Sequence, residues 1–305
     1  MYSYGAILSI LDQAGIYYKR IGKQYMGVCP VCGRGHRTPC CSYSEENLWY
    51  CFSCGSGGGI KALKEALKLN VDLKKFTVSG VQIKKEIKKE VDLTCSVKPY
   101  LSEKPDVESI RWLENRGIDY EKVKDFIKFI TPKKSWHYKN GFRIAIPSID
   151  KKGKMRNVKI RNVFDEEKRK NLEIGMKVIS WKGGENYSIG LNFIPDDADF
   201  VLIVEGEMDF LSVKSLDKYF PVIAVPSANY KFKDELQYLP KKIFLLLDND
   251  EVGKRHSERL KNELEEKNFK VRIESYPKGI KDFNDLLMLD KKKAFEKLLK
   301  VKKGA

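Results

Sequence analysis

Short apolar runs that stop at turn or acidic residues dominate the last third of the chain. Four of them have the length of strands and lie at 200–205, 221–226, 242–248 and 270–275. Helical patterns follow the first three runs, at 207–217, 233–238 and 253–267. A strand buried on both faces is apolar throughout, and strands that alternate with helices are typical of a parallel sheet. Residues 199–290 are therefore predicted to form a parallel α/β unit.

The preceding segment, residues 101–198, has a mixed pattern. Helical periodicity covers Val107–Glu114 and Tyr120–Phe129, and strand-like runs cover Gly141–Pro147 and Met155–Arg161. Because strand side chains alternate between faces, Lys159 and Arg161 are expected opposite Val158 and Ile160. We predict an α+β subdomain with a basic strand.

Three further segments complete the chain. Residues 1–70 are rich in cysteine and glycine, with helix-like stretches at 6–11 and 60–67. Residues 71–100 have mixed charge and few core residues, which predicts a solvated linker. Residues 291–305 form a basic amphipathic tail, expected as a surface helix.

The formal net charge of +16 over 305 residues favours a polyanionic partner such as nucleic acid, although a lysine-rich surface can also serve solubility. No apolar stretch approaches the roughly 20 residues of a membrane helix. No signal-peptide pattern is evident at the N-terminus. We therefore predict a cytoplasmic protein that does not enter a membrane.

Six of the seven cysteines lie between positions 29 and 54. Cys29 and Cys32 form one Cys-x-x-Cys knuckle, and Cys51 and Cys54 form a second. Four thiolates at this spacing suit tetrahedral Zn²⁺, and a closed ligand shell predicts a structural ion. The remaining candidates between the knuckles, Cys40, Cys41 and His36, are predicted to be sheet residues and not ligands.

Aromatic residues surround these knuckles, namely Tyr43, Trp49, Tyr50 and Phe52. Two interpretations stay open. Exposed aromatics beside cations would stack on single-stranded bases, whereas a small zinc module also needs aromatics to build its core.

Acidic clusters follow three of the strand-like runs. They are Glu205-Gly206-Glu207, Asp248-Asn249-Asp250 and Lys281-Asp282. The carboxyl ends of parallel strands line one crevice, so carboxylates there would converge and repel one another. Divalent cations relieve such repulsion, which predicts Mg²⁺ or Mn²⁺ chemistry on phosphates. Taken singly, each cluster could equally cap a helix.

Together, these clusters resemble the Toprim domain shared by primases, topoisomerases and some nucleases. The cysteine knuckles resemble the zinc-binding domain of DnaG-type DNA primases, especially the four-cysteine version in phage primase–helicases. Gly141–Gly153, the basic strand with Lys159 and Arg161, and Tyr187–Asn192 resemble the RNA polymerase domain of the same family. The resemblance implies an α/β protein with a small zinc-ribbon-like N-terminal domain and an RNA polymerase domain that contains a Toprim subdomain.

The resemblance also implies roles for individual residues. Glu205, Asp248, Asp250 and Asp282 would be catalytic and would hold Mg²⁺ or Mn²⁺. The nucleotide- and template-binding set would be Lys159, Arg161, Arg143 and Asp209, the last supporting the acidic cluster. The implied partners are single-stranded DNA, ribonucleoside triphosphates, the RNA primer product and a separate replicative helicase, because no P-loop motif is present.

The implied activity is synthesis of short RNA primers by metal-dependent nucleotidyl transfer. Two alternatives use the same features. One is a Toprim-type metal-dependent nuclease, which needs neither the zinc knuckles nor the basic strand. The other is a non-catalytic nucleic-acid-binding replication accessory of a mobile element, which would not need an intact acidic cluster.

Overall fold

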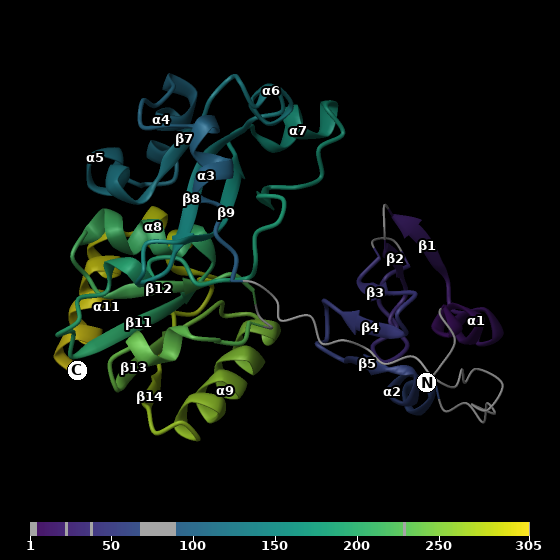
Figure 1. Ribbon diagram of the computed structural model, residues 1–305. Coiled ribbons are helices and arrows are strands. Elements are labelled where there is room, and N and C mark those ends of the chain that lie inside the picture. Colours follow the sequence, from purple (N-terminus) through teal and green to yellow (C-terminus); the bar gives the residue numbers. More distant parts are fainter. Residues whose placement is uncertain (1–4, 22–23, 37–38, 68–89, 228–229, 305) are drawn as a thin grey trace. The chain divides into compact units, whose positions relative to one another are not determined.

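The structure, a computed structural model, describes residues 5–21, 24–36, 39–67, 90–227 and 230–304. The chain divides into two compact units, Met1–Lys88 and Lys89–Ala305, which are described separately (Figure 1). Most of the predicted linker, residues 71–89, lies outside the described residues.

The first unit is an antiparallel sheet with two helices. Its elements are α1 (Ala6–Gln13), β1 (Tyr18–Ile21), β2 (Gln24–Gly27), β3 (Cys41–Tyr43), β4 (Leu48–Cys51), β5 (Gly57–Gly59) and α2 (Ile60–Leu67). The strands pair in chain order. Apolar side chains of both helices, including Ile10 and Leu63, share one core with Tyr43 and Trp49. The two predicted helical stretches are thus confirmed.

The second unit begins with a five-stranded antiparallel sheet of order β10-β9-β8-β7-β6. Its strands are β6 (Leu101–Ser102), β7 (Lys128–Ile130), β8 (Phe142–Ile149), β9 (Met155–Asn162) and β10 (Val178–Ser180). The α-helices of this part are α3 (Thr94–Val97), α4 (Val107–Glu114), α5 (Tyr120–Val123), α6 (Ser135–Lys139) and α7 (Glu166–Asn171). Single 3₁₀ turns are η2 (Lys98–Tyr100), η3 (Lys124–Phe126) and η4 (Leu191–Phe193).

Two sequence expectations fail in this part. The helix predicted over Tyr120–Phe129 ends at Val123, because Phe129 pairs with Ile144 in the sheet and becomes part of β7. Residues 90–100, placed in the linker, fold with the second unit. Leu93 and Val97 are buried in the same core as Val158, so this end of the segment carries core residues.

A four-stranded parallel sheet of order β12-β11-β13-β14 completes the unit. The elements are β11 (Phe200–Glu205), α8 (Gly206–Leu216), β12 (Val222–Val225), η5 (Glu235–Tyr238), β13 (Lys242–Leu246), α9 (Glu251–Glu265), β14 (Lys270–Ile273), α10 (Phe283–Leu289) and α11 (Lys291–Gly304). The predicted strands and parallel pairing are confirmed. The segment predicted as a helix at 233–238 contains one 3₁₀ turn.

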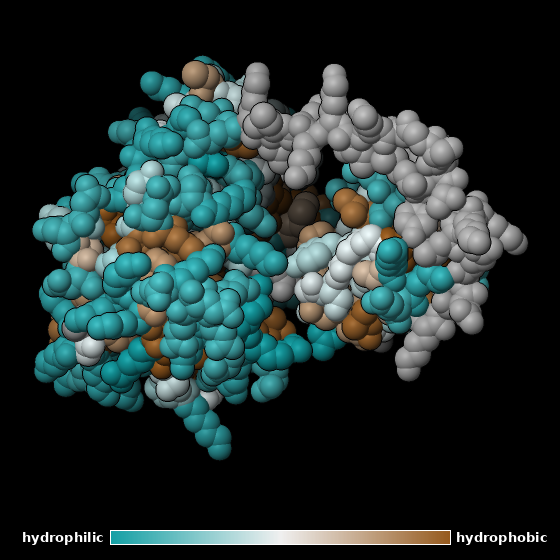
Figure 2. All heavy atoms as spheres, turned by 60° about the horizontal axis from the view of Figure 1, so that its bottom comes forward, coloured by the Kyte–Doolittle hydropathy of each residue, from teal (hydrophilic) through white to brown (hydrophobic). Residues whose placement is uncertain are grey.

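Both faces of this sheet are covered, which explains why its strands are apolar throughout. Leu202 and Val204 point into the core that includes α8, α10 and α11, whereas Val201 and Ile203 point into the core that includes α9. The outer surface of this unit, at the left of Figure 2, is mostly hydrophilic in that view. Among the described helices, none has the length and apolar character needed to span a membrane.

Candidate active site and zinc centre

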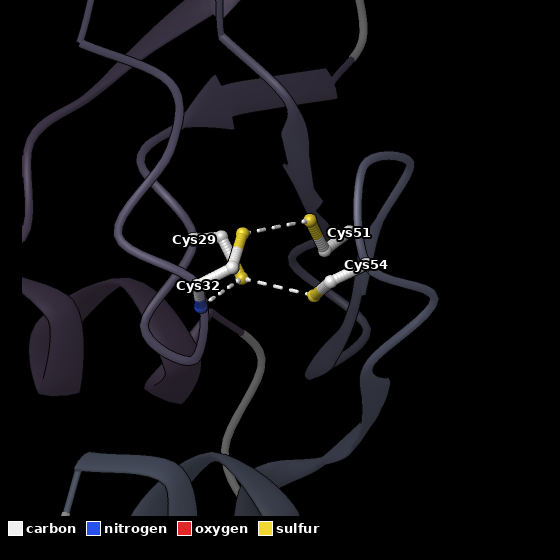
Figure 3. A group of neighbouring side chains, drawn as sticks. All are labelled: Cys29, Cys32, Cys51 and Cys54. Carbon is white, nitrogen blue, oxygen red and sulfur yellow. Dashed lines mark hydrogen bonds between the residues drawn. The ribbon is translucent and has the colours of Figure 1, made fainter. Parts of the chain in front are cut away.

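The four knuckle cysteines meet in the first unit (Figure 3). The Sγ atoms of Cys29 and Cys54 are 3.7 Å apart, and those of Cys32 and Cys51 are 3.9 Å apart. A tetrahedron with metal–sulfur bonds of about 2.3 Å has edges of about 3.8 Å. The thiols therefore fit a tetrahedral Zn²⁺, as the spacing predicts.

Two further cysteines and several aromatic residues lie near the knuckles in the sequence. Cys41 is buried, and the Cys40 Sγ donates to the Arg34 carbonyl at 3.1 Å, although it also lies 3.8 Å from the Cys51 Sγ. The aromatics differ in burial. Tyr43 and Trp49 are core residues, whereas the Phe52 side chain is exposed and touches Tyr50 edge-on. The core interpretation is confirmed for Tyr43 and Trp49, and base stacking stays a prediction for the exposed Phe52.

In the second unit, Glu205 and Asp248 stand at or just after the ends of β11 and β13, whereas Asp282 follows the end of β14 by nine residues. Glu205 is the last residue of β11 and also the residue before α8. Gly206 alone turns the chain from strand to helix, and its φ of +80° is a left-handed conformation that favours glycine. The Glu205 carboxylate is therefore positioned directly by the sheet.

The second and third clusters start helices. Asp250 caps α9, its Oδ1 accepting from the amides of Val252 at 3.0 Å and Gly253 at 2.9 Å. Asp282 caps α10 in the same way, accepting from the Asp285 amide at 2.8 Å. A Cβ atom on Gly253 would lie 2.0 Å from the Asp248 carbonyl oxygen, so glycine permits α9 to approach Asp248. The capping and cation-binding interpretations are compatible, because each carboxylate has a second oxygen.

Burial and neighbouring negative charges both raise carboxyl pKa values in this group. Burial raises the pKa of Asp248 to about 6, and the charges of Glu205 and Asp282 add to that rise, while the Lys281 ammonium at 3.0 Å opposes it. Asp209 is buried, which raises its pKa well above the usual value, with the Asp282 charge adding to the effect.

Two buried oxygens here, Glu205 Oε2 and Asp209 Oδ2, have no hydrogen-bond partner among the described residues. Mutually repelling carboxylates with unpaired oxygens suit a divalent cation. Among the described residues, the four cysteines are the group of three or more potential ligands that lie within 4.8 Å of one another. The described carboxylates of the acidic residues do not form such a group.

The predicted basic residues separate into two sites. Arg161 and Lys159 are half-buried on β9, opposite the buried Val158 and Ile160 as expected. The Arg161 Nη1 lies 2.7 Å from Glu207 Oε1, immediately beyond Glu205, and burial lowers the pKa of Lys159. Arg143 instead forms ion pairs with two residues of the α4 N-terminus, Asp106 at 3.3 Å and Glu108 at 3.0 Å.

Arg161 also lines a pocket of about 510 Å³ with residues of α4 and its following turn. There, the guanidinium groups of Arg161 and Arg116 lie over the Trp112 ring, with their central carbons 5.4 and 5.3 Å from its centre. Burial and the Arg161 charge lower the pKa of Arg116. Trp112 and Arg116 could not be predicted, because no pattern in the α4 segment points to β9.

Comparison with known proteins identifies both units. A CHC2 zinc finger family matches residues 2–98, and a Toprim-like family matches residues 202–287. The DNA primase of Clostridium acetobutylicum is 25% identical over 333 positions, which cover 92% of this chain and 54% of that protein. Along nearly its whole length, the chain is similar to a DNA primase.

Other primases are also similar to the chain. The DNA primase of Rickettsia conorii is 25% identical over 160 positions, covering 46% of this chain and 27% of that protein. The chain thus spans about half, or less, of the length of these curated relatives. The crystal structure of the Aquifex aeolicus primase, with its zinc-binding and RNA polymerase domains, matches with a TM-score of 0.53 at 19% identity over 96% of this chain and 81% of that one.

A DnaG primase catalytic domain bound to ssDNA matches with a TM-score of 0.51 at 18% identity over 68% of this chain and 77% of that one. These structural matches show that the chain shares its fold with the zinc-binding and RNA polymerase domains of those primases, and the Toprim-like match lies within the second unit.

Proposed function

We propose that the chain is a DNA primase that makes short RNA primers on single-stranded DNA. The observation that carries the proposal is the Arg161–Glu207 ion pair. It joins the acidic site to the pocket that Arg161 and Arg116 line. Carboxylates that hold a cation therefore adjoin cations that hold phosphates. Primase relatives support this interpretation over a nuclease, and the unpaired buried carboxylate oxygens support a working site over a non-catalytic accessory.

Glu205, Asp248, Asp250 and Asp282 would hold Mg²⁺ or Mn²⁺ through the oxygens that do not cap helices. A bound divalent ion lowers the pKa of an attacking 3′-hydroxyl and neutralises charge on the phosphate. Asp209 would support the cluster from the first turn of α8. Lys281, paired with Asp248, would exchange this partner for an incoming phosphate when the cation binds.

Arg161 and Arg116 would bind the triphosphate of a ribonucleotide. Both guanidinium groups lie over the Trp112 ring, so they are close enough together to bind one triphosphate. Lys159, on the same face of β9, would contact the template or the nucleotide. For Arg143 we favour a structural role, because two carboxylates already neutralise it.

The zinc unit would contact the template through exposed residues such as Phe52, whose ring can stack on an unpaired base. The ssDNA-bound relative supports single-stranded DNA as the template. A structural Zn²⁺ on the four cysteines would hold this unit folded. A separate helicase partner remains a prediction from the sequence.

Primer synthesis tests the proposal directly. The chain is incubated with mixed-sequence single-stranded DNA, labelled ribonucleotides and Mg²⁺ or Mn²⁺, and products are resolved by length. We expect short oligomers from the wild type and a loss of at least about 100-fold with Asp248→Ala. Asp197→Ala changes an exposed carboxylate just before β11 and is expected to retain activity.

Each alternative predicts a different result in the same assay. Cleavage of the DNA without nucleotide incorporation would favour the nuclease. DNA binding that survives Asp248→Ala, with neither incorporation nor cleavage by the wild type, would favour the accessory. Either result would overturn the proposal.

A further inference from the structure

His256 lies on α9 and faces the acidic site without any assigned role. Its side chain is 1% exposed, and its Nδ1 is 3.7 Å from Glu205 Oε2. Among the described residues, neither ring nitrogen has a hydrogen-bond partner. A buried polar group left without a partner is destabilising, so an apolar residue would pack here at lower cost.

Glu205 Oε2 is an acceptor in the same situation as the His256 nitrogens. It is buried and also lacks a partner, although 20% of the Glu205 side chain is exposed. A neutral imidazole with its proton on Nδ1 is a donor, and a carboxylate oxygen is an acceptor. The separation of 3.7 Å exceeds a hydrogen bond of about 3 Å, so the bond requires the two side chains to approach by about 0.7 Å. Catalytic hydrogen bonds are often long before ligands bind.

We propose that His256 is a positioning residue for Glu205. It donates from Nδ1 to Oε2, fixes the carboxylate orientation and leaves the other oxygen for a divalent cation. Outer partners of this kind orient a metal-binding carboxylate, and their loss typically weakens metal binding or activity about 10- to 100-fold. The fold supports this role, because Gly253 brings the first turn of α9 against Asp248, and His256 follows on the next turn.

This inference rests on the proposed function for its activity readout, but cation binding tests it independently. Mn²⁺ binding to the zinc-loaded full chain is measured by electron paramagnetic resonance, without nucleotide or DNA. Three variants separate the position of the donor from packing. His256→Asn keeps an N–H on the atom next to Cγ, His256→Gln moves the N–H outward to the Nε2 position, and His256→Leu removes it while filling the space.

We expect His256→Leu and His256→Gln to weaken Mn²⁺ binding about 10-fold or more and to lower kcat similarly, with little change in the KM for nucleotide. His256→Asn should remain within about threefold of the wild type. Equal Mn²⁺ affinity in all four proteins would overturn the inference, as would equal losses in the His256→Asn and His256→Gln variants. Should His256→Leu fail to fold in thermal melts, the other two variants still decide.

The outcomes for His256 and for primer synthesis are distinguishable. A wild type that binds Mn²⁺ but makes no primer would overturn the proposed function, while the variant series would still test His256. A wild type that makes primers, with Mn²⁺ affinity independent of the residue at position 256, would overturn the positioning role alone. Nitrogen hyperfine coupling to bound Mn²⁺ would show direct coordination and would also overturn positioning through Glu205.

Discussion

Lys214 is a buried cation in the second unit. Its side chain is 1% exposed, and its Nζ donates to the carbonyls of Lys218 at 3.0 Å and Phe220 at 2.8 Å. Burial lowers the pKa of Lys214 to about 8, although the Asp217 charge opposes this shift. Folding therefore favours loss of this proton in mildly alkaline solution.

The lowered pKa predicts a pH-dependent stability. Between about pH 8 and the ordinary lysine pKa near 10.4, the unfolded chain holds a proton at Lys214 that the folded chain has released. Stability then rises with pH, by up to about 1.4 kcal/mol per pH unit for one proton. Urea unfolding of the wild type and Lys214→Met at about pH 7.5 and about pH 9.5 measures this contribution.

The difference between the two proteins isolates Lys214 from other titrating groups. We expect the wild type to gain stability relative to Lys214→Met as the pH rises. A difference that stays constant across this pH range would contradict the lowered pKa.

The sequence predicted the site residues that directly follow strands, but not the residues that meet across the fold. Glu205 and Asp248 could be found because a buried strand must end next to them. Trp112, Arg116 and His256 could not, since each lies on or beside a helix whose partner is distant in the chain. It could not be predicted either that Arg143 and Arg161 have different ion-pair partners, because both lie on predicted strands.

Among the elements, α8, α10 and the turn after α4 are joined by the buried Asn284. Its backbone N–H donates to Asp209 Oδ1 at 3.0 Å. Its side-chain Nδ2 donates to Ser212 Oγ and to the Arg116 carbonyl, each at 2.9 Å. The side chain thus links the parallel sheet's helices to the turn that carries Arg116.

Replacing this side chain should loosen both connections. Asn284→Ala leaves the Arg116 carbonyl and Ser212 Oγ without this donor, and we expect a loss of about 2–4 kcal/mol in the free energy of unfolding. Chemical denaturation followed by tryptophan fluorescence measures it. Asp285→Ala, one residue along the same helix and exposed, is the matched control; an equal loss there would contradict the linking role.

The zinc knuckles connect two parts of the first unit, because Cys29 and Cys32 lie between β2 and β3 while Cys51 ends β4 and Cys54 follows it. One Zn²⁺ per chain is expected by elemental analysis. Cys51→Ser should lose the metal and the folded first unit, since structural zinc contributes directly to folding. Cys95→Ser changes an exposed thiol and should keep both. Full zinc content in Cys51→Ser would point to Cys40 as a replacement ligand, given its 3.8 Å separation from Cys51.

Element boundaries show where local pattern is sufficient. Val107–Glu114 and Ile60–Leu67 form helices with the predicted ends, because each pairs an apolar face with a core. The Tyr120–Phe129 prediction fails because Phe129 has two ways to be buried, on a helix or in the sheet, and pairing with β8 decides between them.

For the whole molecule, a net charge of +16 predicts salt-sensitive binding to DNA. A chain that contacts about four phosphates of a single strand would lose roughly 50-fold in affinity between about 50 and 200 mM salt. Fluorescence anisotropy with a labelled oligonucleotide measures this slope. An affinity independent of salt would show that the positive charge serves solubility and not template binding.

The order of modules could be predicted from sequence because each carries its own local signature: cysteine knuckles, a basic strand and acidic strand ends. The exact extent of the linker could not, since Leu93 and Val97 are two apolar residues in a charged segment, and only the core that receives them makes them structural.

Helix α8 has almost no solvent-facing side. Nine of its eleven residues are buried, including Glu207 and Asp209, whereas five of the fifteen residues of α9 are buried. A helix enclosed in this way has few positions at which evolution can substitute freely. In a library of all single substitutions selected for function, α8 should therefore accept far fewer changes than α9, and the segment after Glu205 should drift more slowly among close relatives than the helices that surround it.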